Sequence, residues 1–354
     1  MKIAALVSGG VDSAVALSEA LAYGAENVTA FYLKVWLEDE LESIAQCPWE
    51  EDLAYVRAVC DQFGVPLEVV PLQLEYYERV VSYALSELRR GRTPSPDIFC
   101  NQRIKFGAFY DYLGDRYDRI VTGHYARTER RDGRYLLKRG VDPVKDQTYF
   151  LSHLTQRQLS RAWFPVGGMQ KQEVRTAAHE MDLPNKDRKD SQGICFLGQV
   201  RYPEFIRHYL GEQRGDIVER ESGRRLGSHA GFWFYTIGQR QGLGLSGGPW
   251  YVVAKDTEEN IVYVSHREHV GENRRNRFTL GQLHWIDGPP QNERLLVRIR
   301  HGPELVPCTV SGENGEHDET LNVVMDTADR GVAPGQFGVL YDGDVCLGAG
   351  MIVD

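Results

Sequence analysis

The chain has 354 residues, more than one ordinary domain holds, so two or three domains are expected. Apolar residues make up 42% and charged residues 26%, as in globular proteins, and no apolar run is long enough to predict a membrane span. The net charge of −9 argues against a uniformly basic nucleic-acid-binding surface, although arginines gather locally at 214–240, 267–277 and 294–300, where they can bind phosphates or simply be solvated.

The first 180 or so residues alternate predicted strands and helices. Apolar runs predict strands at 2–7, 28–36, 67–72 and 119–124, and periodic segments predict helices at 13–24, 50–64 and about 75–90. This alternation predicts an α/β fold with a doubly wound parallel sheet that helices cover on both faces. Ligands of such sheets lie at the carboxyl ends of the strands, where SGGVDS, LKVW and TGHY stand. Because the first strand begins near Lys2, we expect no targeting segment and a cytoplasmic protein.

After a predicted helix at 202–211 the pattern becomes all-β, with short alternating runs between turns rich in Gly, Asn and Asp. The runs lie at 231–239, 250–257, 260–265, 277–285, 294–300, 320–326, 337–343 and 345–353. The Gly288-Pro289-Pro290 stretch predicts a junction between two β units. The expected domains are therefore 1–195, a central mostly β domain at 196–280 and a C-terminal β-barrel at 281–354.

The string SGGVDS, residues 8–13, stands between a predicted strand and a helix. Backbone N–H groups of such a glycine turn, with a helix N-terminus behind them, form an anion site. Gly9 and Gly10 allow close backbone approach, and Asp12 suits a divalent cation better than a phosphate. The loop resembles the pyrophosphate loop of the N-type ATP pyrophosphatases, which cleave ATP between the α and β phosphates and attach AMP to an oxygen.

The stretch TPSPDIFCN, residues 93–101, holds a cysteine that is a candidate nucleophile. Its two prolines predict that the next helix begins only after Cys100, with Asn101 as the cap. Cys100 would then face a helix N-terminus with Arg103 and Lys105 nearby, and each of these favours the thiolate. The alternative is a buried structural cysteine.

A second cysteine, Cys195, lies in DSQGICFLGQ, residues 190–199, between the α/β part and the β part. Its apolar neighbours favour a structural role for this cysteine. Two features favour a catalytic role: pockets tend to form at domain boundaries, and an adenylated carbonyl needs an attacking group. The charged segment 186–190 suits a loop that orders when a substrate arrives. Asp97, three residues before Cys100, is a candidate general acid or base. The six cysteines show no CxxC pair and no zinc-site spacing.

Six motifs appear in order: SGGVDS, PSPDIFCN, TGHYAR, KDQTYFL, DSQGICFLG and YTIGQRQGLG. Together they resemble the tRNA-specific 2-thiouridylase family, over essentially the whole chain. The resemblance implies an N-terminal domain like the adenine nucleotide alpha-hydrolases. It also implies ATP-dependent replacement of the 2-oxygen of the wobble uridine by sulfur, in tRNAs for Lys, Glu and Gln, with release of AMP and pyrophosphate.

The resemblance also assigns roles residue by residue. ATP contacts fall on Leu6, Val7, Ser8, Gly9, Gly10, Val11, Asp12, Ser13, Leu33 and Gly123, and Mg²⁺ is implied by ATP use. Cys195 carries persulfide sulfur from a cysteine desulfurase or a sulfur-relay protein, and Cys100 is its partner nucleophile, so that a disulfide joins the two after turnover. The target base meets Ser95, Pro96 and Asp97; the tRNA anticodon arm meets Lys145, Asp146, Gln147, Arg300 and His301; and His124 and Gln336 support activity.

The sequence departs from the usual family pattern at Val7, Leu33, Ser95 and His301. Tyr149 and Phe150 are either core residues or stacking partners for the extruded base. Two other functions are considered. A different ATP pyrophosphatase would amidate or thiolate another acceptor, but neither a glutaminase segment nor a three-cysteine cluster is visible. A non-catalytic RNA-binding or nucleotide-binding protein would have no reason to keep both candidate cysteines.

Overall fold

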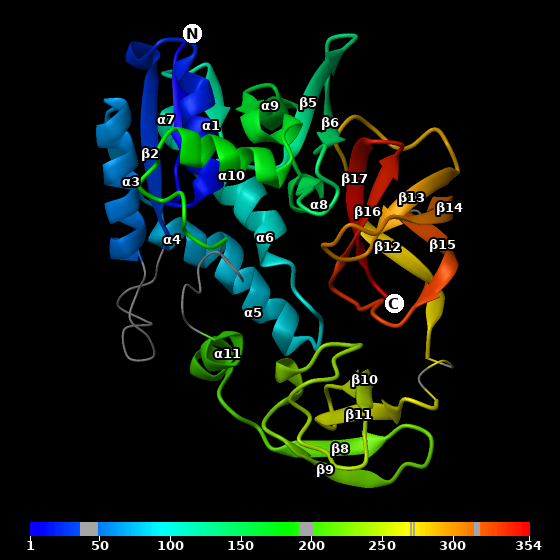
Figure 1. Ribbon diagram of the computed structural model, residues 1–354. Helices are drawn as coiled ribbons and strands as arrows, with labels where there is room; N and C mark the ends of the chain where they lie inside the picture. The colour runs from blue at the N-terminus through cyan, green and yellow to red at the C-terminus, as the bar shows by residue number, and fades with distance from the viewer. Residues whose placement is uncertain (36–48, 191–200, 270, 272, 315–318) are drawn as a thin grey trace.

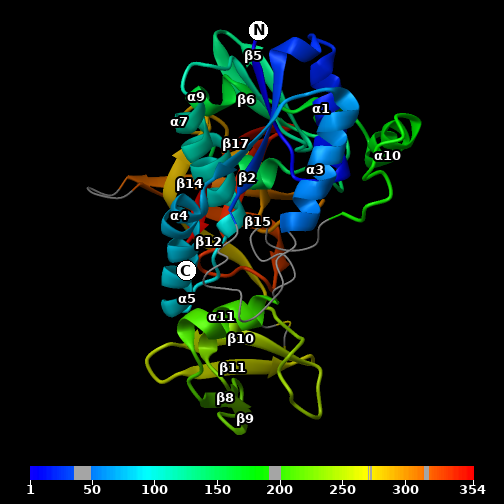
Figure 2. The same cartoon turned by 90° about the vertical axis from the view of Figure 1, so that its left-hand side faces the viewer.

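The computed structural model describes residues 1–35, 49–190, 201–269, 271, 273–314 and 319–354. Its strands form three sheets, one in each of an N-terminal, a central and a C-terminal part (Figure 1). Figure 2 shows the central sheet at one end of the molecule, below the N-terminal sheet. Among the described helices, none has the length and apolar character needed to cross a membrane.

The N-terminal part is built around five parallel strands in the order β3-β2-β1-β4-β7. Their bounds are β1 Ile3–Leu6, β2 Val28–Lys34, β3 Leu67–Pro71, β4 Arg119–Val121 and β7 Ala162–Trp163. The side chains of β1 alternate between two hydrophobic cores. Ala4 and Leu6 pack on one face of the sheet, and Ile3 and Ala5 pack on the other. Both faces of this strand are buried, and the predicted doubly wound parallel sheet is confirmed.

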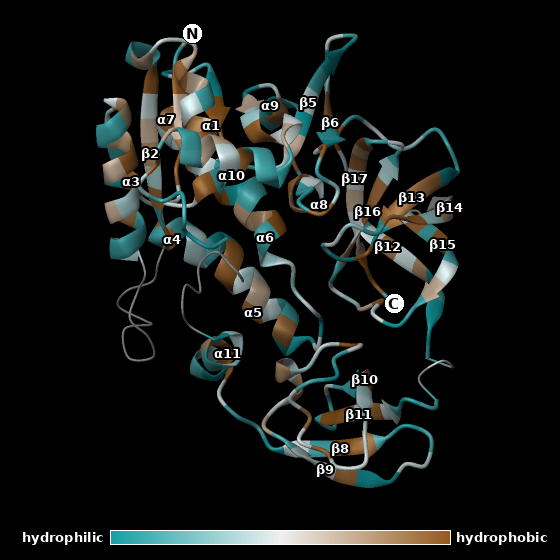
Figure 3. Cartoon of the chain, in the orientation of Figure 1, coloured by the Kyte–Doolittle hydropathy of each residue, from teal (hydrophilic) through white to brown (hydrophobic). Residues whose placement is uncertain are grey.

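Helices cover both faces of this sheet. On the face of Ile3 and Ala5 lie α1 Val11–Leu21, α3 Trp49–Phe63 and α10 Lys171–Glu180. On the other face lie α4 Gln73–Tyr76, the π-helical segment Tyr77–Val81, α5 Ser82–Arg89, α6 Pro96–Phe99, the π-helical segment Cys100–Ala108 and α7 Phe109–Leu113. The shorter α8 Thr148–Leu151 and α9 Gln156–Leu159 follow. Figure 3 shows alternating apolar and polar bands along α3, as expected for a helix with one buried face.

The central part begins with α11 Tyr202–Leu210 and continues as a four-stranded sheet in the order β10-β11-β8-β9. The bounds are β8 Gly215–Glu219, β9 Arg225–His229, β10 Trp250–Asp256 and β11 Ile261–His266. The prediction of a strand at 231–239 was wrong. Gly231 and Gly238 have positive φ angles, and between them Phe232–Phe234 form a 3₁₀ turn that buries Phe232 and Trp233.

The C-terminal part is a closed barrel of six antiparallel strands, because β12 pairs with both β15 and β17. The bounds are β12 Arg275–Trp285, β13 Arg294–Arg298, β14 Val306–Asn314, β15 Glu319–Asp329, β16 Phe337–Asp342 and β17 Val345–Ile352. The predicted barrel is therefore present. The prediction of a junction at Gly288–Pro290 was wrong, since this turn joins β12 to β13 within the barrel.

A hairpin of the N-terminal part extends the barrel sheet. β5 Ala126–Arg131 and β6 Arg134–Arg139 pair with each other, and β6 pairs with β17, where Leu137 lies opposite Cys346. Sequence patterns did not predict this hairpin. The pairing joins the barrel to the segment that follows TGHY, and so connects the C-terminal part to the N-terminal part.

Candidate active site

The loop between β1 and α1 has the geometry of an anion site. Gly9 has a φ of +78°, and Ser13 Oγ donates to Gly10 O at 2.9 Å and accepts from Ser8 N at 3.1 Å. These bonds hold the turn at the N-terminus of α1, an 11-residue helix. A Cβ on Gly9 would lie 2.7 Å from Arg188 Nη1 and 2.8 Å from Asp52 O, so only glycine fits there.

Other predicted ATP contacts lie at neighbouring strand ends. Leu33 is near the end of β2, and Gly123 follows β4. A Cβ on Gly123 would lie 2.7 Å from Asp12 C and Ser13 N, so the strand end packs directly on the first turn of α1. The parallel sheet thus brings these residues to one edge beside the loop.

Asp12 belongs to an ionic network that sequence reasoning missed. Its Oδ1 accepts from Tyr125 Oη at 2.8 Å and from Lys171 Nζ at 2.7 Å. Lys171 Nζ also lies 2.8 Å from Asp190 Oδ1, and Asp190 Oδ2 accepts from Lys145 Nζ at 2.6 Å. The network links the SGGVDS loop to the KDQTYF segment and to the last described residue before the stretch that holds Cys195.

Charge balance holds Asp190 ionised. Burial alone would raise the pKa of its carboxyl, but hydrogen bonds from Lys145 and Lys171 outweigh burial and hold the pKa well below its usual range. Burial first, and the neighbouring Asp12 second, raise the pKa of the Tyr125 phenol, so Tyr125 stays a hydrogen-bond donor. Lys171, whose side chain is 15% exposed, is therefore held between two carboxylates beside the glycine loop.

The charged segment 186–190, which we expected to become ordered when a substrate arrives, is held by several side-chain contacts in the structure. Arg175 Nη1 donates to Lys186 O at 3.0 Å and to Arg188 O at 2.6 Å, and Arg188 is ion-paired with Asp52. The backbone of this charged segment is thus held beside the glycine loop, and the preceding Asn185 Nδ2 also donates to Gly9 O of that loop at 2.9 Å.

The helix that carries Cys100 begins earlier than predicted. Pro96 occupies its first turn, where a missing N–H costs nothing, and the helical backbone continues through Cys100. Asn101 is therefore not a cap. Its Nδ2 donates to Asp97 O at 3.1 Å and to Phe150 O at 3.2 Å, which ties the PDIFCN helix to the KDQTYF segment.

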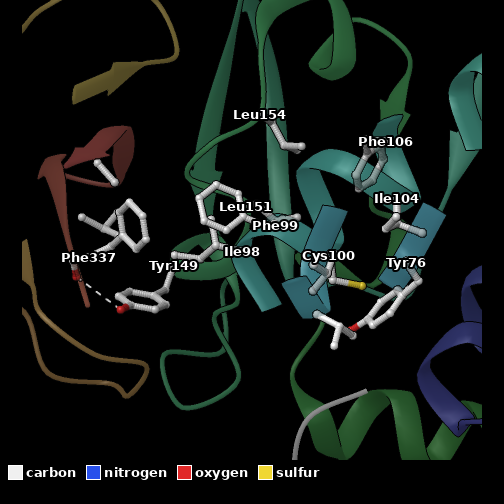
Figure 4. Close-up of a cluster of buried hydrophobic side chains, with 14 of the residues drawn as sticks. Tyr76, Ile98, Phe99, Cys100, Ile104, Phe106, Tyr149, Leu151, Leu154 and Phe337 are labelled. Carbon is white, nitrogen blue, oxygen red and sulfur yellow. Dashed lines mark hydrogen bonds between the residues drawn. The ribbon is translucent and has the colours of Figure 1, made fainter. Parts of the chain in front are cut away.

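Cys100, itself part of this helical stretch, points into the apolar core and is 3% exposed. Figure 4 shows its sulfur pointing toward Tyr76, with Ile104 close by. The Arg103 guanidinium, which was expected near this thiol, lies 3.8 Å from the Phe99 ring centroid and donates to Arg79 O. Cys195, the other predicted nucleophile, lies outside the described residues.

Asp146 is a buried structural residue rather than an exposed tRNA contact. Its side chain accepts from Arg139 Nε at 2.9 Å and Thr148 Oγ1 at 2.8 Å, and Arg298 Nη1 lies 3.0 Å away. Arg298 is 2% exposed, so this member of the 294–300 arginine cluster cannot contact a phosphate either. The ion pair joins the KDQTYF segment to β13 of the barrel.

Removing this carboxylate should destabilise the protein strongly. Asp146→Ala leaves Arg298 buried without its ion-pair partner, and we expect a loss of about 3–5 kcal/mol in the free energy of unfolding. The control Asp326→Ala breaks the exposed pair with Arg294 and should change little. Chemical denaturation compares the variants, and equal midpoints would contradict the structural role of Asp146.

The neighbouring predicted contacts are nearer the surface. Lys145 is partly exposed in its bond to Asp190, and Gln147 Oε1 accepts from Tyr125 N at 3.0 Å. Arg300 is exposed and bound to Asp329 by two bonds of 2.8 and 2.7 Å. The exposed His301 ring lies 4.6 Å from that of Phe150.

The PDIFCN helix, the KDQTYF segment and one end of the barrel meet at one place. Tyr149 Oη donates to Phe337 O at 3.2 Å, and Phe337 packs on Phe99 with ring centroids 5.7 Å apart (Figure 4). Ser95 N donates to Tyr83 Oη at 3.3 Å. Thus Ser95, Pro96 and Asp97 begin a helix that the KDQTYF segment and the barrel both cover. Tyr149 is 4% exposed and serves the core.

The two predicted supporting residues occupy defined positions. His124 is buried, its Nδ1 lies 2.8 Å from Thr122 Oγ1, and burial lowers its pKa well below the usual value, so the imidazole is neutral. Gln336 precedes Phe337 at the barrel end that packs on the PDIFCN helix. Through the described residues, no cluster of three His, Cys, Asp or Glu side chains forms a metal site.

Comparisons with known proteins match the chain from end to end. The model of the tRNA methyl transferase HUP domain matches residues 1–199, that of the tRNA methyl transferase PRC-barrel domain residues 203–266, and that of the Aminomethyltransferase beta-barrel domain residues 275–352. The first of these alone spans more than half of the chain.

Full-length relatives carry one name. The chain is 44% identical over 359 residues to the tRNA-specific 2-thiouridylase MnmA 1 of Bacteroides thetaiotaomicron, covering 99% of both chains. It is 44% identical over 361 residues to MnmA of Parabacteroides distasonis, covering 100% of this chain and 99% of that one. It is 44% identical over 368 residues to MnmA of Porphyromonas gingivalis, covering 99% of both.

Proposed function

Because this chain belongs to the tRNA-specific 2-thiouridylase family, we propose that it uses ATP to replace the 2-oxygen of a tRNA wobble uridine by sulfur. The family models' descriptions mention methyl transfer, but the full-length relatives are all named for thiolation. The observation that carries the proposal is the ionic network from Asp12 through Lys171 and Asp190 to Lys145, because it joins the anion loop to a segment predicted to contact the tRNA.

The residues around the loop fit the phosphates of ATP. The backbone N–H groups at the start of α1 and the positive end of that helix face the glycine turn, where a Cβ on Gly9 has no room. Leu6, Val7 and Leu33 are the apolar residues of this edge and would contact adenine. Lys171 would neutralise charge on the pyrophosphate as it leaves.

Magnesium would be bound mainly by the phosphates themselves. Mg²⁺ in nucleotide sites usually keeps water ligands and takes one or two carboxylates. Asp12 is the carboxylate of the loop, and its Oδ1 already accepts from Tyr125 and Lys171. The chain would therefore offer Mg²⁺ a single carboxylate rather than a preformed cage.

The chemistry proposed for the uridine has two stages. Its 2-oxygen attacks the α-phosphorus of ATP, pyrophosphate leaves, and the oxygen becomes part of a good leaving group. Sulfur then attacks the same ring carbon, and AMP departs with that oxygen. Holding uridine and nucleotide together makes the first stage effectively intramolecular.

The sulfur would come from Cys195 as a persulfide loaded by a donor protein. The Cys100 thiolate attacks the Cys195 sulfur, the S–S bond of the persulfide breaks, and hydrosulfide is released beside the activated base. A Cys100–Cys195 disulfide remains, which an external thiol must reduce before the next turnover. In support of this role, Cys100 continues the helix that starts with the predicted base-binding residues Pro96 and Asp97.

Nucleoside mass spectrometry tests this function. The protein is incubated with a wobble-uridine tRNA, ATP, Mg²⁺ and sulfide, and the digested tRNA should contain uridine with sulfur in place of one oxygen. A matched transcript with cytidine at the wobble position should gain none. Release of AMP and pyrophosphate without sulfur gain would contradict thiolation while preserving adenylation.

A further inference from the structure

Arginines surround a hollow between the central sheet and the barrel. Its volume is about 470 Å³, and its lining includes Arg240, Tyr251, Arg267, Glu268, Arg274 and Arg330. The first five come from the central part or the segment that follows it, whereas Arg330 follows β15 of the barrel. The hollow is therefore assembled by two parts of the fold.

The hollow has excess positive charge. Four permanently charged guanidinium groups line the hollow together with a single carboxylate, Glu268, whose Oε2 lies 3.7 Å from His266 Nδ1. Within the described part of the chain, none of these four arginines forms an ion pair with an acidic side chain. By contrast, Arg294 and Arg300 of the barrel are each paired with an aspartate. On a chain with net charge −9, four arginines gathered around one glutamate indicate an anionic ligand.

A second, smaller hollow adjoins the first. Its volume is about 330 Å³, and it shares Arg240 and Pro249 with the arginine hollow. Its wall is the glycine-rich segment 242–248 with Leu243, Leu245 and Trp250. Glycines allow a ligand to approach the backbone closely, and apolar side chains suit a ribose or base. A phosphate and the nucleoside attached to it would match the two hollows together.

The arginine hollow is connected to the predicted tRNA contacts. A Cβ on Gly238 of the central part would lie 3.3 Å from Arg330 O, so the two parts touch at this wall. Arg330 directly follows Asp329, which holds Arg300 by two hydrogen bonds. An RNA lying on Arg300 and His301 therefore has a direct path to Arg330.

We propose that this arginine hollow binds a backbone phosphate of the tRNA, with its nucleoside in the glycine-walled hollow, at a nucleotide other than the wobble uridine. The inference rests on the proposed function and assigns to these residues affinity for tRNA rather than chemistry. Phosphate contacts carry most of the salt-dependent affinity for nucleic acids, and Arg330 over the Tyr251 ring at 5.0 Å is held in place for such a contact.

Removing arginines tests the site. In the double variant Arg240→Gln/Arg267→Gln, we expect the dissociation constant for tRNA to rise by about tenfold or more, and the KM for tRNA with it. The plot of log affinity against log salt should become shallower by about one unit for each phosphate that the variant no longer binds. Arg330→Gln should act in the same direction. The exposed Arg130→Gln on β5 removes one charge, as Arg330→Gln does, and should leave affinity unchanged.

The outcomes separate the alternatives. Unchanged affinity and salt slope in both the double variant and Arg330→Gln would overturn the proposal. A higher KM for ATP with an unchanged KM for tRNA would also overturn it, by assigning the hollow to a free nucleotide. Because binding is measured without turnover, a wild-type protein that binds tRNA but forms no 2-thiouridine would contradict the proposed function while leaving the hollow testable.

Discussion

Cys100→Ser should abolish 2-thiouridine formation while ATP cleavage and tRNA binding persist. The physical reason is the nucleophile: a serine hydroxyl does not ionise near neutral pH and cannot break a persulfide S–S bond. We expect a fall in turnover of about a thousandfold or more. Cys195→Ser should give the same loss, because the persulfide could not form. Single-turnover assays with a protein sulfur donor measure both variants.

A matched buried cysteine controls for folding. Cys60 is 2% exposed in α3, and burial raises the pKa of its thiol to about 11. Cys60→Ser should therefore cost some stability and keep full thiolation. If Cys100→Ser retained wild-type turnover with the donor protein, the two-cysteine mechanism would be wrong.

Lys171→Met should abolish release of AMP and pyrophosphate. Lys171 Nζ contacts Asp12 of the loop and lies 15% exposed between two carboxylates, so its charge faces the place where pyrophosphate would develop. Removing one such preorganised group usually lowers turnover by about 10²–10³. The measurement is tRNA-dependent formation of AMP and pyrophosphate from labelled ATP.

Lys138 provides the matched control for Lys171. It is 18% exposed and also lies between two carboxylates, those of Glu129 and Asp344, at 2.9 and 3.2 Å. Lys138→Met should keep ATP cleavage. Equal activity of the Lys171 and Lys138 variants would show that the ionic network only supports the fold.

Local sequence patterns were sufficient to predict the fold class and the anion loop. The run IAALV is apolar throughout because both faces of β1 are buried, and the turn SGGVDS requires glycine at Gly9, where no side chain fits. The family resemblance is confirmed by relatives that match the whole chain. The individual site residues remain predictions.

Contacts between residues far apart in the chain could not be predicted from the local sequence patterns. Lys171 meets Asp12 across 159 positions, and nothing in either local motif indicates that pairing. The family resemblance implied a tRNA contact at Asp146, but the carboxylate of Asp146 is buried against Arg298 from a distant strand. Pro96 was taken as a helix breaker, although a proline is well tolerated in a first helical turn.

In the proposed mechanism, the uridine oxygen is activated by adenylation and leaves with AMP. A tRNA transcript carrying ¹⁸O at the 2-position of the wobble uridine tests it directly, with the AMP analysed by mass spectrometry after thiolation. Adenylation of that oxygen predicts ¹⁸O-labelled AMP in proportion to the 2-thiouridine formed. Unlabelled AMP alongside newly formed 2-thiouridine would contradict it, because the oxygen would then have left by another route.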